Sequence, residues 1–339
     1  MELTLLVPDV AARYTLERPP GPRNPGGGVG IKYARMEQML SQAYHVHRTS
    51  QLDTVETDFV IVEPLWFSWF EDQRADAHAI DTRLDTFIER MFRNILVCGS
   101  EQELYLWPAQ RRQKLLTTAH HITHNCTYLR NLFQAAGIPN SRLLCDPVPE
   151  HVFYPTIKQN RIYAASHISW QKNTKALIEL YRTLQDTDIE TVYAGSAQTW
   201  GDSATEVALR NRHHLEAELR EVTDTFLGDV PPHTVAFYGN AAQHHIQVAH
   251  HDTCCQNQQE AALAGATLWG LNHPINTERP VNQFQNIETL AAALIEEHEA
   301  VRDIPCFPKV NGTVRDYALK HFSYSAVLAQ FHEIIRSAS

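Results

Sequence analysis

Short apolar and β-branched runs recur along the chain, and segments with helical periodicity separate them. Most of these runs lack a clean alternation of apolar and polar residues, which is typical of parallel strands that are buried on both faces. Strands that alternate with helices favour βαβ units and therefore an α/β fold with parallel sheets. The predicted strands are residues 2–8, 58–64, 94–100, 120–126, 141–148, 161–167, 190–196, 234–240 and 267–272.

A proline-containing break divides the chain near its middle. Residues 146–160 hold three prolines and little periodicity, and the alternation of strands and helices resumes after them. We interpret the break as a linker between two Rossmann-like domains, residues 1–152 and 158–322, which a final amphipathic helix at 323–339 follows. The predicted helices are residues 31–42, 80–92, 126–137, 174–185, 206–222, 286–298 and 323–339.

Composition supports a soluble globular protein. The 339 residues suffice for two domains, and 43% are hydrophobic and 20% charged. No apolar run approaches the roughly 20 residues of a membrane span, and the first residues lack the pattern of a signal peptide. The six cysteines show no C-x-x-C spacing, which favours reduced thiols. We expect a cytoplasmic, soluble protein, and peripheral association with a membrane stays open.

The net charge of −10 argues against a general nucleic-acid binder, because such proteins carry a basic footprint. One local basic cluster occurs at 109–114, and a solvated helix face explains it most simply. A glycine tract lies between the first predicted strand and the first helix. Glycines allow a backbone to approach a phosphate, and the N-terminus of the following helix favours an anion, although the spacing matches neither G-x-G-x-x-G nor the Walker pattern. A flexible surface loop is the alternative. The glycines are Gly26, Gly27, Gly28 and Gly30.

The order of several weak motifs resembles the GT-B glycosyltransferases. Within that group, the motifs are most similar to those of the large retaining family that uses nucleotide sugars. Its members are the family 4-like enzymes with a glycogen synthase-like C-terminal domain. Residues 123–155 resemble the end of that family's first domain, with a P-V-x-x-x-x-F-x-P stretch that leads into the second. Residues 161–185 resemble its G-R-l-x-x-x-K-N element, with Lys172 and Asn173 in place. The residues at the remaining similar positions are Gly195, Gly239 and Glu260.

This resemblance implies two Rossmann-like domains whose parallel sheets face a central cleft. The second domain would bind the nucleotide sugar, hereafter the donor, the first would bind the acceptor, and the last helix would pack back on the first domain. A lysine and helix N-termini can neutralise a leaving diphosphate without a metal ion, and an acidic residue can accept both ribose hydroxyls. The candidate donor-binding residues are Gly27, Gly28, Gly30, His167, Lys172, Asn173, Gly195, Gly239, Asn240 and Glu260.

The sequence also departs from the family. His167 replaces an arginine, and Asp252 stands where the family has the first glutamate of an E-x7-E pair. Asp252 is therefore a candidate catalytic residue in an altered loop, or it simply ends a strand. Glu63 and His124 follow first-domain strands and are candidates to contact the acceptor hydroxyl. Lys172 as an ordinary helix-start lysine and Glu260 as an ordinary acid in a helix are the simpler alternatives.

The 19 histidines raise the question of a metal site. His250 and His251 lie near Cys254 and Cys255, and zinc sites often mix these ligands. Adjacent residues on a strand point to different faces, however, so we expect no metal. Trp66 and Trp69 follow a strand, where they could stack on a sugar or pack in the core.

The sequence thus predicts a hexosyltransferase-type glycosyltransferase that uses a UDP- or GDP-sugar, retains anomeric configuration and needs no cofactor. The acceptor stays open between a glycan, a lipid-linked glycan, a small molecule and modified nucleic acid. Two alternatives also stay open. One is a non-catalytic GT-B protein that binds a nucleotide or glycan, and the other is a viral-type enzyme that glycosylates DNA.

Overall fold

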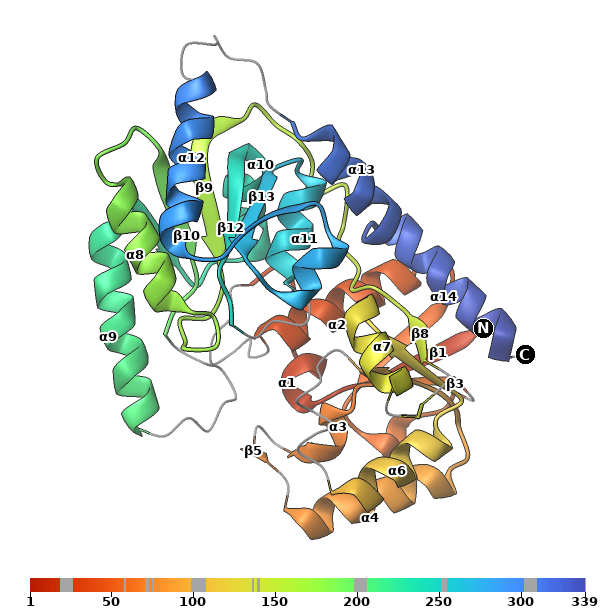
Figure 1. Ribbon diagram of the computed structural model, residues 1–339. Helices are drawn as coiled ribbons and strands as arrows, with labels where there is room; N and C mark the ends of the chain where they lie inside the picture. Colours follow the sequence, from red (N-terminus) through yellow and green to blue (C-terminus); the bar gives the residue numbers. More distant parts are fainter. Residues whose placement is uncertain are drawn as a thin grey trace.

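Two parallel sheets, each covered by helices, make up the structure. In the part of the chain that it describes, each sheet has six strands, and a short antiparallel ribbon accompanies them (Figure 1). The α/β prediction is confirmed. The computed structural model describes residues 1–18, 27–57, 59–70, 73–74, 76–98, 108–135, 137–138, 141–197, 206–250, 255–301 and 310–338.

The first sheet has the strand order β2-β1-β3-β6-β7-β8. Successive residues of β1 enter different apolar clusters, because alternate side chains of a strand point to opposite faces. Leu5 joins one cluster and Leu6 the other, so helices cover both faces of the sheet. The strands of this half, ribbon included, are β1 (Glu2–Leu6), β2 (His45–Thr49), β3 (Phe59–Val62), β4 (Trp69–Phe70), β5 (Gln73–Arg74), β6 (Arg93–Cys98), β7 (His121–His124) and β8 (Ser141–Leu143).

The basic cluster at 109–114 lies on a solvated helix face, as the sequence predicts. Arg111 Nε donates to Asp81 Oδ1 at 2.7 Å, and Lys114 forms an ion pair with Asp85. Both aspartates lie on the neighbouring helix, Ala77–Glu89. The helix before β8 ends at Ala135 and Gly137 has a φ of +83°, the left-handed conformation that glycine adopts after a helix. The helices of this half are α1 (Asp9–Ala12), α2 (Gly27–Leu40), η1 (Leu52–Thr54), α3 (Leu65–Ser68), α4 (Ala77–Glu89), α6 (Ala109–Thr118) and α7 (Thr127–Ala135).

The second sheet has the order β11-β10-β9-β12-β13-β14. Its two faces are also apolar, since Ile162 and Tyr163 of β9 belong to different clusters. Three of its strands, β11, β12 and β14, match no predicted strand, and β9 begins two residues before the strand predicted at 161–167. The strands are β9 (Gln159–Ala165), β10 (Glu190–Ala194), β11 (Thr225–Gly228), β12 (Ala242–Gln247), β13 (Thr267–Leu271) and β14 (Val281–Phe284).

The strand predicted at 234–240 is wrong, because these residues form most of α10. Pro231 precedes that helix and Pro232 occupies its first turn, where the fixed φ of proline suits a helix start. The strand follows instead at β12, in which His244 and His245 are fully buried. The indole Nε1 of Trp269 donates to His244 Nδ1 at 3.1 Å, so the neighbouring strand satisfies one polar atom of this central strand.

Helix α8 shows why the predicted helices of this half form where they do. Its apolar residues recur at helical spacing, and Leu177, Leu180, Tyr181 and Leu184 are buried against the sheet. Helix α9 also has the predicted bounds. The helices after β9 are α8 (Thr174–Leu184), α9 (Glu206–Val222), α10 (Pro232–Ala241), α11 (Gln256–Leu263), η2 (Pro274–Glu278), α12 (Ile287–Val301), α13 (Gly312–His321) and α14 (Tyr324–Ala338).

The chain passes between the two sheets twice, at neighbouring points. Val148 N donates to Phe322 O at 2.8 Å, and Val148 forms a parallel bridge with Ser323. After this point α14 runs along the first half and packs against α2 (Figure 1). Tyr324, at the start of α14, donates through its hydroxyl to Gln38 Oε1 of α2 at 2.9 Å. The last helix therefore ends beside the N-terminus, on the half that holds β1.

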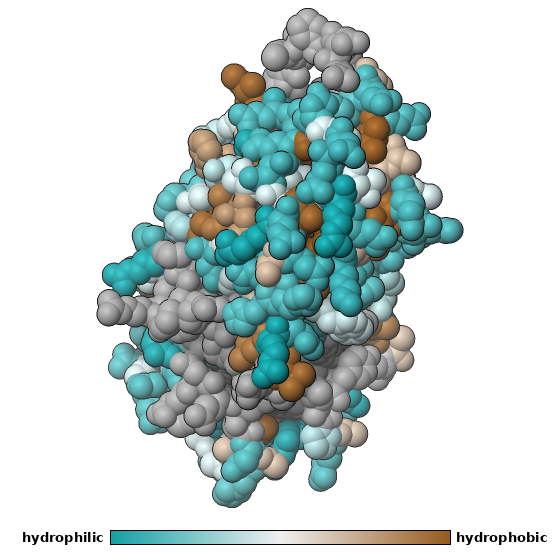
Figure 2. Space-filling model, turned by 90° about the vertical axis from the view of Figure 1, so that its left-hand side faces the viewer, coloured by the Kyte–Doolittle hydropathy of each residue, from teal (hydrophilic) through white to brown (hydrophobic). Residues whose placement is uncertain are grey.

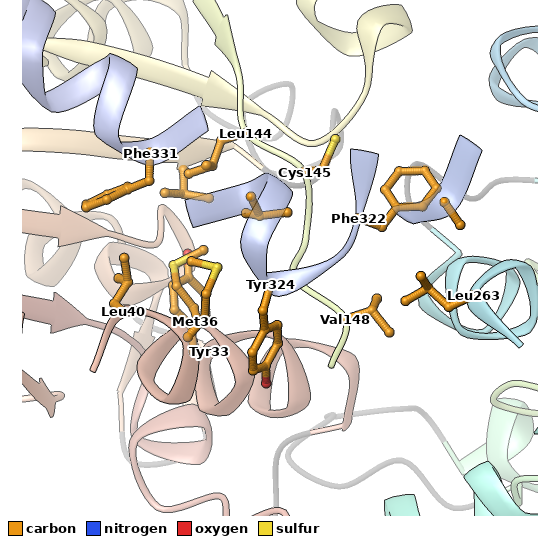
Figure 3. Close-up of a cluster of buried hydrophobic side chains, with 14 of the residues drawn as sticks. Tyr33, Met36, Leu40, Leu144, Cys145, Val148, Leu263, Phe322, Tyr324 and Phe331 are labelled. Atoms are coloured by element: carbon orange, nitrogen blue, oxygen red, sulfur yellow. The ribbon is translucent and has the colours of Figure 1, made fainter. Parts of the chain in front are cut away.

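One apolar cluster is continuous between the halves. Figure 3 shows Tyr33 and Met36 of α2 and Phe331 of α14 on one side, with Leu263 of α11 and Phe322, directly after α13, on the other. Because such burial stabilises by about 25 cal/mol per Å² of apolar surface, the cluster holds the halves together as well as each half alone.

The outer face formed by α8 and α9 is largely hydrophilic where the structure describes it, and hydrophobic residues are scattered over it (Figure 2). None of the helices in the described ranges combines the length and the hydropathy needed to cross a membrane.

Candidate functional site

Polar side chains gather where the first sheet's strands end. Glu63 directly follows β3 and is buried. The hydroxyl of Tyr33, on α2, donates to Glu63 Oε2 at 2.6 Å, and Lys32 Nζ lies 3.4 Å from the same oxygen. A buried carboxylate needs such partners, since desolvation penalises an unpaired charge. The predicted acceptor-side residue Glu63 is thus held by two residues of one helix.

Lys32 also reaches a second carboxylate. Its Nζ lies 3.7 Å from Asp146 Oδ1, in the segment after β8, and Asn125 Nδ2 donates to Asp146 Oδ2 at 3.4 Å. His124, the last residue of β7, is fully buried, and its ring lies 4.2 Å from that of Phe133. Carboxyl ends of parallel strands share one edge of a sheet, so Glu63, His124 and Asp146 lie at the same edge.

Glu260 makes an ion pair between the two halves that the sequence does not predict. Arg35 Nη2 of α2 lies 2.5 Å from Glu260 Oε1 of α11, and both side chains are buried. Burial raises the pKa of Glu260, and Arg35 opposes that rise. Glu260 therefore lies inside a helix and already has a cation on one oxygen, whereas the sequence predicts a ribose-binding carboxylate.

Four buried polar atoms around this pair lack a hydrogen-bond partner among the described residues. They are Glu260 Oε2, Arg35 Nη1 and the hydroxyls of Tyr14 and Tyr163. Both tyrosines interact electrostatically with Glu260, so the four atoms belong to one region. Burial raises the pKa of Tyr14 to about 12, and the phenol therefore stays a neutral donor. Several orphaned polar atoms in one region are unusual in a protein interior and suit polar ligand atoms or water.

The second half presents Lys172 in the loop between β9 and α8. Ser169 and Thr174 brace this loop: Ser169 N donates to Thr174 Oγ1 at 3.1 Å, and Lys172 N donates to Ser169 Oγ at 3.3 Å. Asn173 has a φ of +51°, a left-handed conformation in which asparagine is enriched among residues other than glycine. The loop thus has a fixed shape, with Lys172 and Asn173 directly before the helix.

Lys172 lines a small cavity of about 30 Å³ at the carboxyl ends of β9 and β12. Ser166, His245 and Cys255 also line it. Cys255 is the N-cap residue of α11, and the next residue, Gln256, donates through Nε2 to Gly28 O at 3.3 Å. The lysine loop of the second half therefore lies close to the point where α11 meets the glycine-containing start of α2.

The predicted glycines serve different purposes. Gly195 has a φ of +132°, and a Cβ there would lie 1.9 Å from Ser166 O, so the ends of β10 and β9 could not pack. A Cβ on Gly30 would lie 2.7 Å from Cγ of Tyr14, which makes this glycine a packing residue. Gly28 has open space around it, and Gly27 is the first residue of α2.

Gly239 and Asn240 lie at the other edge of the second sheet, because α10 ends where β12 begins. Asn240 Nδ2 donates to Val152 O at 2.9 Å, and its Oδ1 accepts from Tyr154 N at 3.2 Å. These bonds tie the connection between the halves to α10. The structure thus places the two residues at the opposite edge of the sheet from Lys172, and the side chain of Asn240 bonds the backbone of the connection.

Other predicted residues fall into three groups. His167 lies in the loop after β9, half-buried, five residues before Lys172. Trp66 packs in the core, and its Nε1 donates to Ser50 O at 2.7 Å. Asp252 and Gly26 lie outside the described residues, as do His251 and Cys254. Within the described part of the chain, no cluster of three His, Cys, Asp or Glu residues could hold a metal ion.

Sequence reasoning misses the three residues that organise this region: Lys32, Arg35 and Asp146. Only the spacing of Lys32 and Arg35 could have indicated them in the sequence. The two residues lie three positions apart on the helix after the glycine tract and therefore share a face. An amphipathic surface helix would expose that face, and only the packing of both halves around α2 shows that it is buried.

No model of a protein family matches this sequence, and no curated protein does. Solved structures match over nearly the whole chain. Sucrose-phosphate synthase from Thermosynechococcus elongatus has a TM-score of 0.69 at 13% identity, with 99% of both chains covered. HepE from Anabaena, in complex with UDP and glucose, has a TM-score of 0.68 at 10% identity, covering 99% of this chain and 100% of that one.

An alpha-glucosyltransferase in complex with UDP and a 13-mer DNA is similar at a TM-score of 0.64 and 10% identity, over 99% of this chain and 100% of that one. These proteins are GT-B glycosyltransferases, and the similarity covers 99% of this chain. Two six-stranded parallel sheets with this connectivity, matched from end to end, give this chain the GT-B fold of glycosyltransferases.

Proposed function

We propose that this protein is a glycosyltransferase that moves a sugar from a nucleoside diphosphate sugar to an acceptor hydroxyl. The observation that supports it most is the set of orphaned polar atoms around Arg35 and Glu260, close to the contact between α2 and α11. Such atoms suit a ligand rich in hydroxyls and phosphate oxygens. The GT-B neighbours that hold UDP support UDP as the nucleotide, and a GDP-sugar is the alternative.

Each half would contribute a different function. Lys172 and the N-terminus of α8 would neutralise the diphosphate as it leaves, because charge that develops in the transition state is stabilised by fixed cations and helix dipoles. Glu260 Oε2 would accept hydrogen bonds from the ribose hydroxyls, with Arg35 keeping the carboxylate ionised. His167, near Lys172, would donate to a phosphate oxygen when it is protonated.

The acceptor would bind at the carboxyl edge of the first sheet. Glu63, His124 and Asp146 lie at that edge, and Lys32 and Tyr33 fix the orientation of Glu63. A carboxylate there can accept the proton of an attacking hydroxyl. Asp252 keeps its place as a candidate from the sequence. We further propose that transfer retains the anomeric configuration and runs without a metal ion.

Two observations favour other outcomes. Arg35 occupies one oxygen of Glu260, which would suit a protein that binds a nucleotide or glycan without turning it over. The neighbour in complex with a 13-mer DNA makes modified DNA a candidate acceptor, although the net charge of −10 gives this chain little general attraction for a polyanion.

The deciding experiment is a panel of UDP-, GDP- and ADP-sugars, tested for thermal stabilisation and for release of the nucleoside diphosphate, with and without EDTA. Stabilisation by the sugars of one nucleotide, together with turnover that EDTA leaves intact, supports a metal-independent glycosyltransferase. Stabilisation without turnover on any acceptor class supports the binding protein. Absence of both contradicts the proposal.

A further inference from the structure

We propose that a cavity on the outer edge of the first sheet binds a small, multiply charged phosphate-bearing solute at a site separate from the donor site. The cavity has a volume of about 820 Å³. β7, β8 and α7 form one wall, and α13 and α14 form the other. His121 begins β7 and Ser141 begins β8, so the cavity opens near the amino ends of these strands. Glu63 and His124 lie at the opposite, carboxyl ends.

The charge of the cavity differs from that of the whole protein. Arg130, Arg142 and Lys320 line it, and Glu333 is the single carboxylate among the residues that do. The chain as a whole has a net charge of −10. Neither Arg142 nor Lys320 forms an ion pair with any carboxylate that the structure describes. Cations placed together without partners raise the local positive potential, which draws an anion from solution.

Arg130 provides a second and independent observation. Its Nε is buried and has no hydrogen-bond partner in the described ranges, and its Nη2 makes only a 3.5 Å contact with Asn131 Oδ1. A buried guanidinium nitrogen without an acceptor is a cost to the folded protein unless a ligand or water supplies one. The side chain as a whole is only half-buried and lines the cavity, so its Nη atoms are the ones that can donate to phosphate oxygens there.

His121 and His321 add a charge that depends on pH, and His120 lines the cavity beside them. His120 and His121 come from the first half, and His321 ends α13. Burial lowers the pKa of His121, and Arg142 and His120 lower it further; burial and Lys320 lower the pKa of His321. An anion between these groups would reverse the effect of the cations and favour the protonated imidazoles. Binding should therefore take up protons and tighten as the pH falls from 8 to 6.

The size of the cavity favours a small molecule over a single phosphate ion or a polymer. A volume of about 820 Å³ is within the range of pockets that enclose a metabolite. A bound phosphate would contact the first half through Arg130 and Arg142 and the end of α13 through Lys320. Helix α13 packs on α11, which carries Glu260, so the solute would link the first half to the helix pair that approaches the donor site.

Titration calorimetry with inorganic pyrophosphate tests the proposal directly. We expect binding to the full-length protein, tighter at pH 6 than at pH 8, with proton uptake shown by two buffers of different ionisation enthalpy. Arg142→Gln and Lys320→Gln should each weaken binding at least fivefold. Lys175→Gln, which removes one exposed charge from α8, is the matched control and should bind as the unaltered protein does.

Pyrophosphate could also bind at Lys172, so the titration is repeated with Lys172→Ala. Binding that persists in this variant and fails in Arg142→Gln belongs to the cavity, whatever the outcome for the donor. Binding that is lost only in Lys172→Ala overturns the proposal, as does absence of binding at millimolar pyrophosphate. A DNA duplex that binds through Arg142 and Lys320 while pyrophosphate does not would also overturn it.

Discussion

Arg35 and Glu260 form a buried ion pair, 2.5 Å between Nη2 and Oε1, although 225 positions separate them in the sequence. The arginine belongs to α2 of the first half, and the glutamate belongs to α11 of the second. The pair lies next to the apolar cluster that α2, α11 and α14 share, because the guanidinium of Arg35 lies 5.3 Å from the ring of Phe153, a member of that cluster. One contact thus connects the residue expected at the donor ribose with the helix that orients Glu63.

Removing one partner of this pair should destabilise the protein strongly. Arg35→Met leaves the Glu260 carboxylate buried without a cation, and such losses cost about 3–5 kcal/mol. Urea denaturation should show this decrease in the free energy of unfolding.

The double variant Arg35→Met/Glu260→Gln is the control for that experiment, because it removes both charges. It should recover more than half of the lost stability, since no buried charge is left uncompensated. A double variant as unstable as Arg35→Met would show that packing of the arginine, which lies 5.3 Å from the ring of Phe153, carries the effect.

Lys172→Ala should weaken binding of the nucleoside diphosphate and leave the fold intact. A hydrogen bond to a charged group contributes about 1.5–3 kcal/mol, which corresponds to roughly 10- to 150-fold in affinity. Calorimetry with UDP measures the change, and circular dichroism checks the fold.

Lys175→Ala is the matched control, since it removes the same charge three residues later, on an exposed position of α8. If UDP binds both variants with equal affinity, the lysine loop is not the diphosphate site, and the proposed donor geometry is wrong.

The sequence predicts the architecture well because the signals that define it are local. Helix α9 and the start of α8 match the predicted ranges, since their apolar periodicity and polar starts depend only on neighbouring residues. Residues 234–240 mislead for the same reason. Their apolar and aromatic side chains favour a strand, yet the proline pair before them starts a helix. Strand β12 is not predicted, because two buried histidines interrupt its apolar pattern.

The site is harder to predict than the fold. The loop of Lys172 follows from a strand, a polar turn and a helix in succession. The partners of Glu63 and Glu260 do not, because Lys32 and Arg35 acquire them only when α2 is enclosed by both halves. Asn240 is a further example: its motif suggests a ligand contact and gives no sign that its side chain bonds the backbone of Val152 and Tyr154.

Two glycine substitutions should differ sharply in effect. Gly195→Ala places a methyl group 1.9 Å from Ser166 O at a φ of +132°, and overpacking and backbone strain each cost about 1–3 kcal/mol. Gly28→Ala meets no atom within 4 Å on α2 and should change stability by less than about 1 kcal/mol, towards greater stability, because alanine favours a helix.

Thermal denaturation of the two variants measures both effects. Equal melting temperatures would show that the backbone at Gly195 relaxes without cost, and the close approach of β9 and β10 would then not require glycine.

His245 should make the protein less stable in acid. Burial lowers its pKa from 6.5 to about 4, because the charged imidazole is not solvated inside the second sheet. Between these two pH values the unfolded chain binds more protons than the folded protein. The free energy of unfolding therefore falls as the pH drops from about 6.5 to 4. Above pH 6.5 the histidine is neutral in both states, and the full stability of the folded protein is kept. A shift of this size corresponds to about 3 kcal/mol.

His245→Phe separates this histidine from the carboxylates, which titrate in the same experiment. Phenylalanine keeps an aromatic ring near Tyr163, 6.2 Å away between centroids, and has no proton to gain. Urea denaturation at pH 7.5, 6.0, 5.0 and 4.5 should give a shallower loss of stability for the variant than for the unaltered protein, whatever their difference at pH 7.5. Parallel curves for the two proteins would mean that His245 becomes protonated without cost, and that water or a neighbouring group reaches it inside the sheet.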